Sequence, residues 1–192
     1  MDYFATDQLI EPENGDLLIS EPYLPDPNFE RTVILLCEHD ENGSFGFVLN
    51  KPSNSGLSEL IEEAEGFDST VYVGGPVQQN TLHFLHKSPN KLSSDKEIVN
   101  GVYWGVDFDN LLTSINTKVV DENDLKFFIG YSGWSEGQLL DELKAKSWIV
   151  YKKATPELVF DMNAEELWKE ALQNMGGKYR VISNYPTDPR LN

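Results

Sequence analysis

Apolar residues in the chain are grouped into short runs with either strand-like or helix-like spacing. The clearest run covers residues 32–38, is rich in Val, Ile and Leu, and is followed by turn-forming residues at 40–43 and a second apolar run at 44–50. Two strand-like runs joined by a short turn that contains Asn-Gly predict a β-hairpin. Apolar residues occupy both odd and even positions of the first run, so we expect this strand to lie inside a sheet that is covered on both faces.

Other runs predict further strands and helices along the chain. Strands are expected at 16–20, 71–73, 81–86, 98–104, 126–131 and 148–151, and helices are expected at 57–64 and 107–115, from Ser135 onward, and from Asn163 to 175. The last two helices each begin with a capping pattern, in which a polar residue is followed three positions later by Gln138 or Glu166. Antiparallel strands mixed with a few helices predict one compact domain of the α+β (mixed α/β) class.

The charge of the chain limits its partners. With 15 Lys and Arg against 32 Asp and Glu, the formal net charge is −17. A chain this acidic repels nucleic acids and anionic membranes, because affinity for phosphates comes mainly from Lys and Arg. No stretch approaches the roughly 20 apolar residues of a membrane helix, the acidic N-terminus does not resemble a signal peptide, and Cys37 is the one cysteine. These features favour a cytoplasmic protein without an internal disulfide.

Cys37 and His39 form the first candidate for chemistry. Residues two apart on a strand share a face, and an imidazole beside a thiol can generate a nucleophilic thiolate. The alternative is that Cys37 is a core residue, since free cysteines are among the most buried residue types. No third group that would orient the pair is evident from the sequence, so a hydrolase or thiol-dependent activity is kept as an alternative to a binding function.

Three other patterns fall short of known catalytic or metal-binding motifs. Residues 130–134 read Gly-Tyr-Ser-Gly-Trp, whereas the hydrolase nucleophile elbow requires Gly-x-Ser-x-Gly, so a tight strand-to-helix turn is expected instead. Residues 74–76, Gly-Gly-Pro, lack the lysine of a phosphate loop. His83 and His86 are three apart and would point to opposite faces of a strand. We therefore expect no metal and no cofactor.

A binding surface made of loops at strand ends is the stronger functional candidate. Such loops commonly carry function on a rigid scaffold, and aromatic residues are favoured at interfaces. The alternative is that the tryptophan packs in the core and the glycines only make turns. The candidate binding residues are Asn50, Lys51, Gly74, Gly75, Pro76, Tyr131 and Trp134.

Several segments of the chain occur together, in this order and spacing, in one known family. They are 15–20 with Pro22, 29–33 through 37–39, 46–52 with 74–77, and 130–131 with Trp134, 137–139 and Trp148. On these segments the chain resembles the YqgE/AlgH family of bacterial proteins over roughly residues 15–175. The resemblance implies a single domain at 15–178, between an N-terminal extension at 1–14 and a C-terminal tail at 179–192, with a split, partly barrel-like β-sheet flanked by helices.

The resemblance supplies no catalytic residue, because none is accepted for the family. Some members carry a regulatory label that is connected with the control of alginate, an exopolysaccharide. We therefore expect a regulatory or adaptor protein that binds an unknown protein partner. A transcriptional regulator that binds nucleic acid is a further alternative, which the charge of −17 disfavours.

Overall fold

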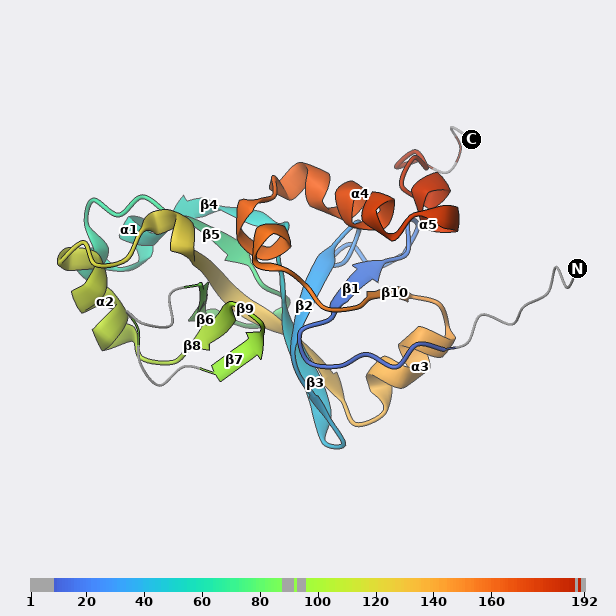
Figure 1. Cartoon of the computed structure of the whole chain (residues 1–192), viewed down its shortest axis with the longest axis horizontal. Helices are drawn as coiled ribbons and strands as arrows, with labels where there is room; N and C mark the ends of the chain where they lie inside the picture. Colours follow the sequence, from blue (N-terminus) through green and yellow to red (C-terminus); the bar gives the residue numbers. More distant parts are fainter. Residues whose placement is uncertain (1–8, 88–91, 93–95, 189, 191–192) are drawn as a thin grey trace, which may run out of the picture.

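A computed structural model describes residues 9–87, 92, 96–188 and 190 of the chain (Figure 1). Its strands follow one path in the order β10-β1-β2-β3-β9-β6-β8-β7, and β4 and β5 lie off this path. The strands are β1 (Leu17–Ser20), β2 (Val33–Asp40), β3 (Gly43–Val48), β4 (Pro52–Gly56), β5 (Thr70–Val73), β6 (Val77–His86), β7 (Lys96–Val99), β8 (Val102–Gly105), β9 (Leu125–Ser135) and β10 (Trp148–Tyr151).

The described residues also form five α-helices and three shorter helical turns, and the last two α-helices follow the final strand, β10. The α-helices are α1 (Leu57–Leu60), α2 (Phe108–Asn116), α3 (Gln138–Lys144), α4 (Ala164–Met175) and α5 (Gly177–Ile182). The shorter turns are the 3-10 turns η1 (Glu62–Ala64) and η2 (Glu122–Asp124) and the π-helical turn η3 (Glu157–Asp161). Antiparallel strands mixed with helices confirm the expected α+β class.

The long strand β9 divides the sheet into two parts. Residues 132–135 of β9 pair with β3, whereas residues 127–129 pair in parallel with β5. β6 pairs with β9 mainly through residues 125–131. The sheet is therefore split, as expected. It does not close into a barrel, because its strand path has two separate ends, at β10 and β7.

Helices cover both faces of the part that holds β1, β2 and β3. Alternate residues of these strands, such as Leu35 and Ile34, enter different core clusters. The cluster of Leu35 also contains Leu167 and other α4 residues, and the cluster of Ile34 contains Leu139 of α3. Figure 1 shows α4 and α3 on opposite sides of these strands. The prediction that β2 lies inside a sheet covered on both faces is confirmed.

A third cluster fills the other end of the molecule. It is formed by α1, α2 and the strands around them, and includes Leu57, Leu111, Phe84 and Phe127. In Figure 1 this part lies to the left of the β2–β3 hairpin, α3 and α5 lie to the right, and α4 runs across the top. The hairpin and β9 therefore lie at the junction between the packed region around α1 and α2 and the packed region around α3 and α4.

Three predicted strands differ from the structure. The strand expected at 81–86 is β6, which already begins at Val77. The expected strand at 98–104 is a hairpin, β7 and β8, that turns at Gly101. The strand expected at 126–131 extends to Ser135, and the following helix begins only at Gln138. The Ser135 N–H donates to Gln138 Oε1 over 3.0 Å, which is one half of the expected capping box, but the N-cap of α3 is Gly137 and no side chain caps the helix. Tyr131 and Trp134 thus lie within a strand rather than in a strand-end loop.

Helix α5 follows α4 directly and crosses residue 178, where the domain was expected to end. Its Tyr179 and Ile182 pack against the α4 side of the core. Beyond it, Tyr185 O accepts a hydrogen bond of 2.6 Å from Arg31 Nη2. Residues 179–185 are therefore packed on the domain, while residues 1–8 of the expected N-terminal extension lie outside the described residues.

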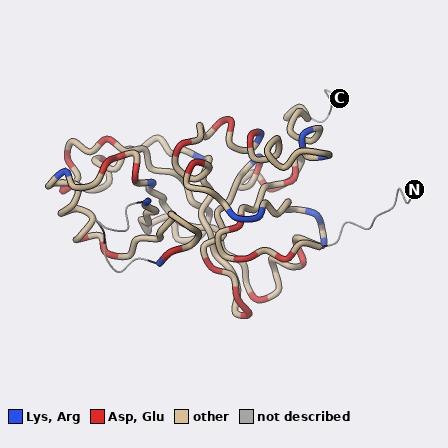
Figure 2. Tube along the Cα trace, viewed as in Figure 1, with Lys and Arg blue, Asp and Glu red and all other residues tan. Residues whose placement is uncertain are grey.

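Asp and Glu residues occur along the whole described trace in Figure 2, including the end of the β2–β3 hairpin. Among the residues that the structure describes, no helix is long and apolar enough to span a membrane.

Candidate functional site

A pocket of about 690 Å³ opens beside the β2–β3 hairpin, at the junction of the two packed regions. Side chains from β2, β3, β6, β8 and β9 line it. Pockets of this size are typical of ligand or side-chain binding sites. Its lining residues include Glu38, Asp40, Phe45, Val77, His83, Trp104, Tyr131 and Trp134.

Four half-buried rings form the inner wall of this pocket. Phe45 lies 4.9 Å from Trp104 and 6.1 Å from Tyr131, measured between ring centroids. His83 lies 6.4 Å from Trp104 and 6.1 Å from Tyr131. Each ring is therefore in contact range of two others, and together they make an aromatic wall. We call Phe45, His83, Trp104 and Tyr131 the ring cluster.

Strand pairing explains why three of these rings share a face. Trp104 is directly opposite Leu85 on β6, and His83 precedes Leu85 by two residues. Directly opposed residues and residues two apart on a strand share a face. Phe45 likewise precedes Phe47 by two residues on β3, and both the Phe47 and the Leu85 side chains belong to the core cluster under α4.

Gly130 brings the fourth ring onto the same face. Simple alternation along β9 would place the Tyr131 and Phe128 side chains on opposite faces of the sheet, because the two residues are three apart. Gly130 has a φ of +65°, which interrupts the regular strand, and the register with β6 shifts between Val77 and Leu82. Glycine adopts this backbone conformation at little cost. As a result, Tyr131 packs on the same cluster as Phe128 and reaches the pocket.

Two carboxylates stand at the mouth of the pocket. The β2–β3 register shifts between Leu36 and Glu38, which is a β-bulge. The bulge places Glu38 directly opposite Phe45, so that its carboxylate faces the pocket. Glu38 Oε2 lies 2.7 Å from Lys96 Nζ in an exposed ion pair. The second carboxylate, Asp40, is exposed and accepts a hydrogen bond of 2.7 Å from the Asn42 N–H.

His83 is the titratable group inside the ring cluster. Its Nε2 lies 2.9 Å from Thr81 Oγ1, and its ring lies 5.2 Å from that of Phe47. Burial lowers the pKa of His83 below its usual value of 6.5. The imidazole is therefore neutral at pH 7, and the pocket carries no positive charge from this side chain.

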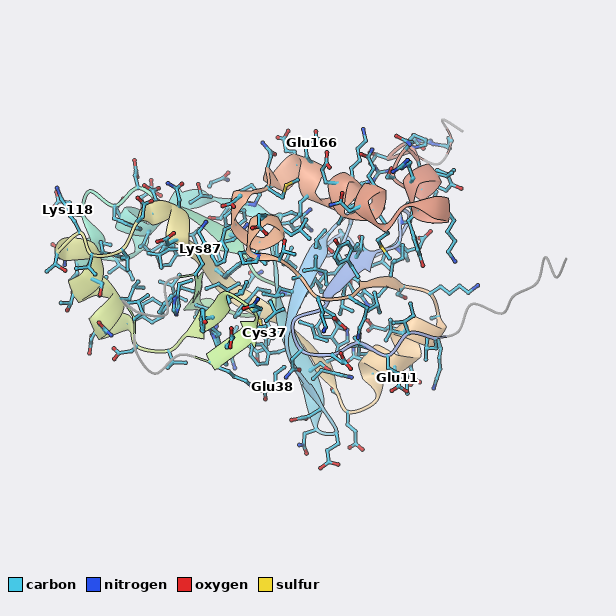
Figure 3. All side chains as sticks on the ribbon, viewed as in Figure 1. Glu11, Cys37, Glu38, Lys87, Lys118 and Glu166 are labelled. Atoms are coloured by element: carbon cyan, nitrogen blue, oxygen red, sulfur yellow. The ribbon has the colours of Figure 1, made fainter. Side chains whose placement is uncertain are left out.

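The same β-bulge shows that the expected Cys37–His39 pair is wrong. Cys37 packs in the core cluster with Leu35, whereas His39 lies opposite Ser44 on the other face. Figure 3 labels Cys37 and Glu38, the two neighbouring residues at this bulge. The Cys37 side chain is 1% exposed, and burial raises the pKa of its thiol. His39 Nδ1 instead lies 2.6 Å from Ser44 Oγ. A reachable thiolate beside an imidazole is absent from this part of the chain.

Asn50 and Lys51 hold neighbouring loops instead of facing the pocket. Asn50 Oδ1 accepts from the Val33 N–H over 2.9 Å, and its Nδ2 donates to Arg31 O over 2.8 Å. Lys51 Nζ donates to Pro27 O at 2.9 Å and to Asn28 O at 2.6 Å. Burial lowers the pKa of Lys51. The hydrogen-bonding groups of both side chains are thus used within the protein.

Gly74 and Gly75 allow the chain to pass very close to β9. A Cβ atom on Gly74 would lie 2.5 Å from Gly130 O, and one on Gly75 would lie 2.2 Å from the carbonyl of Tyr131. The Gly74 N–H donates to Ile129 O over 2.9 Å, and Ser132 Oγ donates to Gly74 O over 3.1 Å. These glycines are explained by packing between backbones. Pro76, which follows them, is exposed.

Trp134 lies at the pocket wall but is anchored in the core. It is 6% exposed, and its ring makes an edge-to-face contact with Trp148 at 6.0 Å. Glu142 Oε2 accepts hydrogen bonds from both indoles, 2.9 Å from Trp134 Nε1 and 2.7 Å from Trp148 Nε1. Of the seven predicted binding residues, only Tyr131 and Trp134 line the pocket, and only Tyr131 does so with a half-buried ring.

Replacing Glu142 by glutamine is expected to lower the free energy of unfolding by about 1 kcal/mol, because hydrogen bonds to a charged acceptor are stronger than those to a neutral one. Chemical denaturation monitored by Trp fluorescence measures this change. Gln at the neighbouring exposed Glu136 provides the matched control and should leave stability unchanged. Equal stabilities for the two variants would contradict the role of the carboxylate between Trp134 and Trp148.

Sequence reasoning missed Phe45, His83 and Trp104 as pocket residues. Alternation along the strands can indicate that His83 and Leu85 share a face, but it cannot indicate which strands are neighbours. The structure also identifies no group of three or more His, Cys, Asp or Glu side chains, among the described residues, that could hold a metal ion.

The fold and the sequence together identify the family. Residues 17–180 match the family model described as AlgH-like, so the chain belongs to the AlgH-like family, which confirms the resemblance seen in the sequence. A UPF0301 protein from Cytophaga hutchinsonii is 45% identical over 179 residues, covering 93% of this chain and 98% of the relative. A UPF0301 protein from Chlorobium limicola is 42% identical over 178 residues, covering 93% of this chain and 95% of the relative.

Two solved structures have the same fold. A crystal structure of a Corynebacterium diphtheriae protein matches with a TM-score of 0.77 at 22% identity and covers 92% of this chain and 94% of that one. The solution structure of the AlgH protein from Pseudomonas aeruginosa matches with a TM-score of 0.72 at 29% identity and covers 92% of this chain and 98% of that one.

Proposed function

We propose that this chain is a regulatory or adaptor protein that binds another protein through the pocket beside the β2–β3 hairpin. The observation that carries the proposal is the ring cluster, in which four half-buried aromatic side chains line one open pocket. Aromatic side chains that remain accessible at the centre of a pocket are typical anchors of protein–protein contacts.

The position of the pocket supports the same function. Strands from both packed regions build it, and Figure 1 shows the β2–β3 hairpin extending beyond the rest of the sheet. An extended segment of a partner could therefore lie against the hairpin and insert one side chain into the pocket. The acidic surface favours a partner that carries positive charge.

A double variant, Trp104→Leu with Tyr131→Leu, is expected to lose most of the partner that the wild-type protein captures from a native lysate at physiological salt. Leucine keeps the pocket apolar but removes the ring faces. The matched control is Tyr103→Leu, because Tyr103 stacks on His86, on the other face of β8. Nuclease treatment removes partners held through nucleic acid, and mass spectrometry quantifies the recovered proteins.

Retention of a near-stoichiometric partner by the double variant, with a folded circular dichroism spectrum, would show that the pocket is not the binding surface. If the double variant and Tyr103→Leu both lost the partner, the proposal would also be contradicted. Binding would then depend equally on a ring outside the pocket.

A further inference from the structure

We propose that the pocket binds the guanidinium group of an arginine side chain presented by the partner protein. The inference rests on the proposed function, since it names the chemistry by which that site recognises its partner. Two sets of groups carry it: the ring cluster inside the pocket, and the carboxylates of Glu38 and Asp40 at its mouth.

The ring cluster provides the faces that attract a cation. A cation is stabilised when it lies within about 6 Å of an aromatic ring centroid, and Trp gives the strongest attraction. Trp104 lies 4.9 Å and Tyr131 lies 6.1 Å from Phe45, so a cation placed against this aromatic wall lies near more than one ring. A flat guanidinium also stacks on aromatic faces, which a compact ammonium does not do.

The charged groups at the pocket mouth are suited to the same ligand. Glu38 and Asp40 line the pocket, and none of the described lining residues is Lys or Arg. Glu38 already attracts one cation, Lys96, over 2.7 Å, but both side chains of that pair are more than 40% exposed. Exposed pairs of this kind are weak and exchange readily. A carboxylate can accept two parallel hydrogen bonds from a guanidinium.

His83 does not oppose the binding of a cation at neutral pH. Burial among Phe47, Trp104 and Tyr131 lowers its pKa, and its Nε2 is paired with the hydroxyl of Thr81. The imidazole therefore adds an aromatic surface without a positive charge. The net charge of −17 attracts a basic segment over a longer range.

Two short peptides test the inference: acetyl-Gly-Arg-Gly-amide and the same peptide with citrulline, the neutral isostere of arginine. Each is titrated into ¹⁵N-labelled protein, and the dissociation constant is taken from the shifts of the Trp104 indole and of residues 43–45. We expect the arginine peptide to bind at least about tenfold more tightly than the citrulline peptide, because cation–π contact and charge pairing are both lost in citrulline.

Two variants locate the two sources of affinity. Trp104→Leu and the double variant Glu38→Gln with Asp40→Asn should each weaken binding of the arginine peptide by about tenfold. Their matched controls, Tyr103→Leu and a double replacement of the exposed Glu62 and Glu63 of η1 by Gln, should bind like the wild type. The ¹⁵N spectrum of each variant shows whether it is folded.

Equal affinity for arginine and citrulline peptides would overturn the inference but leave the proposed function intact, since the pocket would still bind a neutral side chain. Arginine-dependent shifts spread over the acidic surface, with none at Trp104, would also overturn it. Failure of the proposed function has a different signature, because partner capture would then survive the loss of Trp104 and Tyr131.

Discussion

Replacing Gly75 by alanine is expected to lower the free energy of unfolding by about 3 kcal/mol or more, because the added methyl group would collide with backbone rather than with a movable side chain. The new Cβ would lie 2.2 Å from Tyr131 C and O and 2.3 Å from Ser132 N. Relief of this contact requires β9 to move away from the segment after β5. The same movement would displace Tyr131 from the ring cluster.

Unfolding by denaturant measures the free energy of unfolding of the Gly75→Ala variant. Gly56→Ala is the matched control. A Cβ on Gly56 would make ordinary contact, with its nearest neighbour at 3.5 Å. We expect Gly56→Ala to change stability by less than about 1 kcal/mol. If Gly75→Ala were as stable as the control, the close approach of the two backbones would be wrong, and a ligand-binding role for the glycines would become the better explanation.

The second large effect is a rise in stability with pH that depends on Lys126. This side chain is 5% exposed, its Nζ donates to Val159 O over 3.0 Å, and it lies 4.2 Å from the centre of the Tyr72 ring. Burial lowers the pKa of Lys126 from 10.5 to about 7. In the unfolded chain the pKa returns to its ordinary value.

The direction of the pH effect follows from proton binding. Between pH 7 and about 10 the unfolded chain holds a proton on Lys126 that the folded chain has released, so the free energy of unfolding rises with pH. The gain between pH 7 and 9 is about 2 kcal/mol. Cys37 acts in the opposite direction above pH 9, because its raised pKa keeps the folded thiol protonated while the unfolded thiol ionises.

Replacing Lys126 by methionine isolates the contribution of Lys126 to the pH dependence of the free energy of unfolding. The variant should lack the rise between pH 7 and 9, and the exposed Lys169→Met control on α4 should retain it. Stability is measured by urea unfolding at half-unit pH intervals, and the difference from the wild type removes the effects of the other titrating groups. Parallel pH profiles for the wild type and Lys126→Met would show that Lys126 stays charged in the folded protein.

Local patterns in the sequence were sufficient to predict the hairpin at β2 and β3 and its two apolar faces. Because β2 has apolar residues at consecutive positions, both of its faces must be buried by other elements, which places it inside the sheet. The helix that begins after Asn163 could also be predicted from the sequence, because its capping residue and its apolar spacing indicate the same start. In the structure Asn163 Oδ1 accepts a hydrogen bond from the Glu165 N–H over 2.8 Å. These features depend on residues close together in the chain.

The pocket was harder to predict because it depends on two irregularities. The bulge after Leu36 moves Glu38 to the pocket face and places Cys37 and His39 on different faces of β2. Regular alternation along a strand predicts instead that Cys37 and His39 share a face. The positive φ of Gly130 similarly moves Tyr131 to the face of Phe128. Pairing between β6, β8 and β9 then brings distant aromatic residues together, and no single-strand pattern specifies that pairing.

Hydrogen–deuterium exchange on the complex between this protein and its captured partner tests the central claim most directly. We expect protection on binding at residues 43–45 and 131–135, which border the pocket beside the hairpin. Protection confined to the separate groove of about 540 Å³ that is lined by Ile10, Tyr179 and Ile182 would contradict the account and place the binding surface at α5.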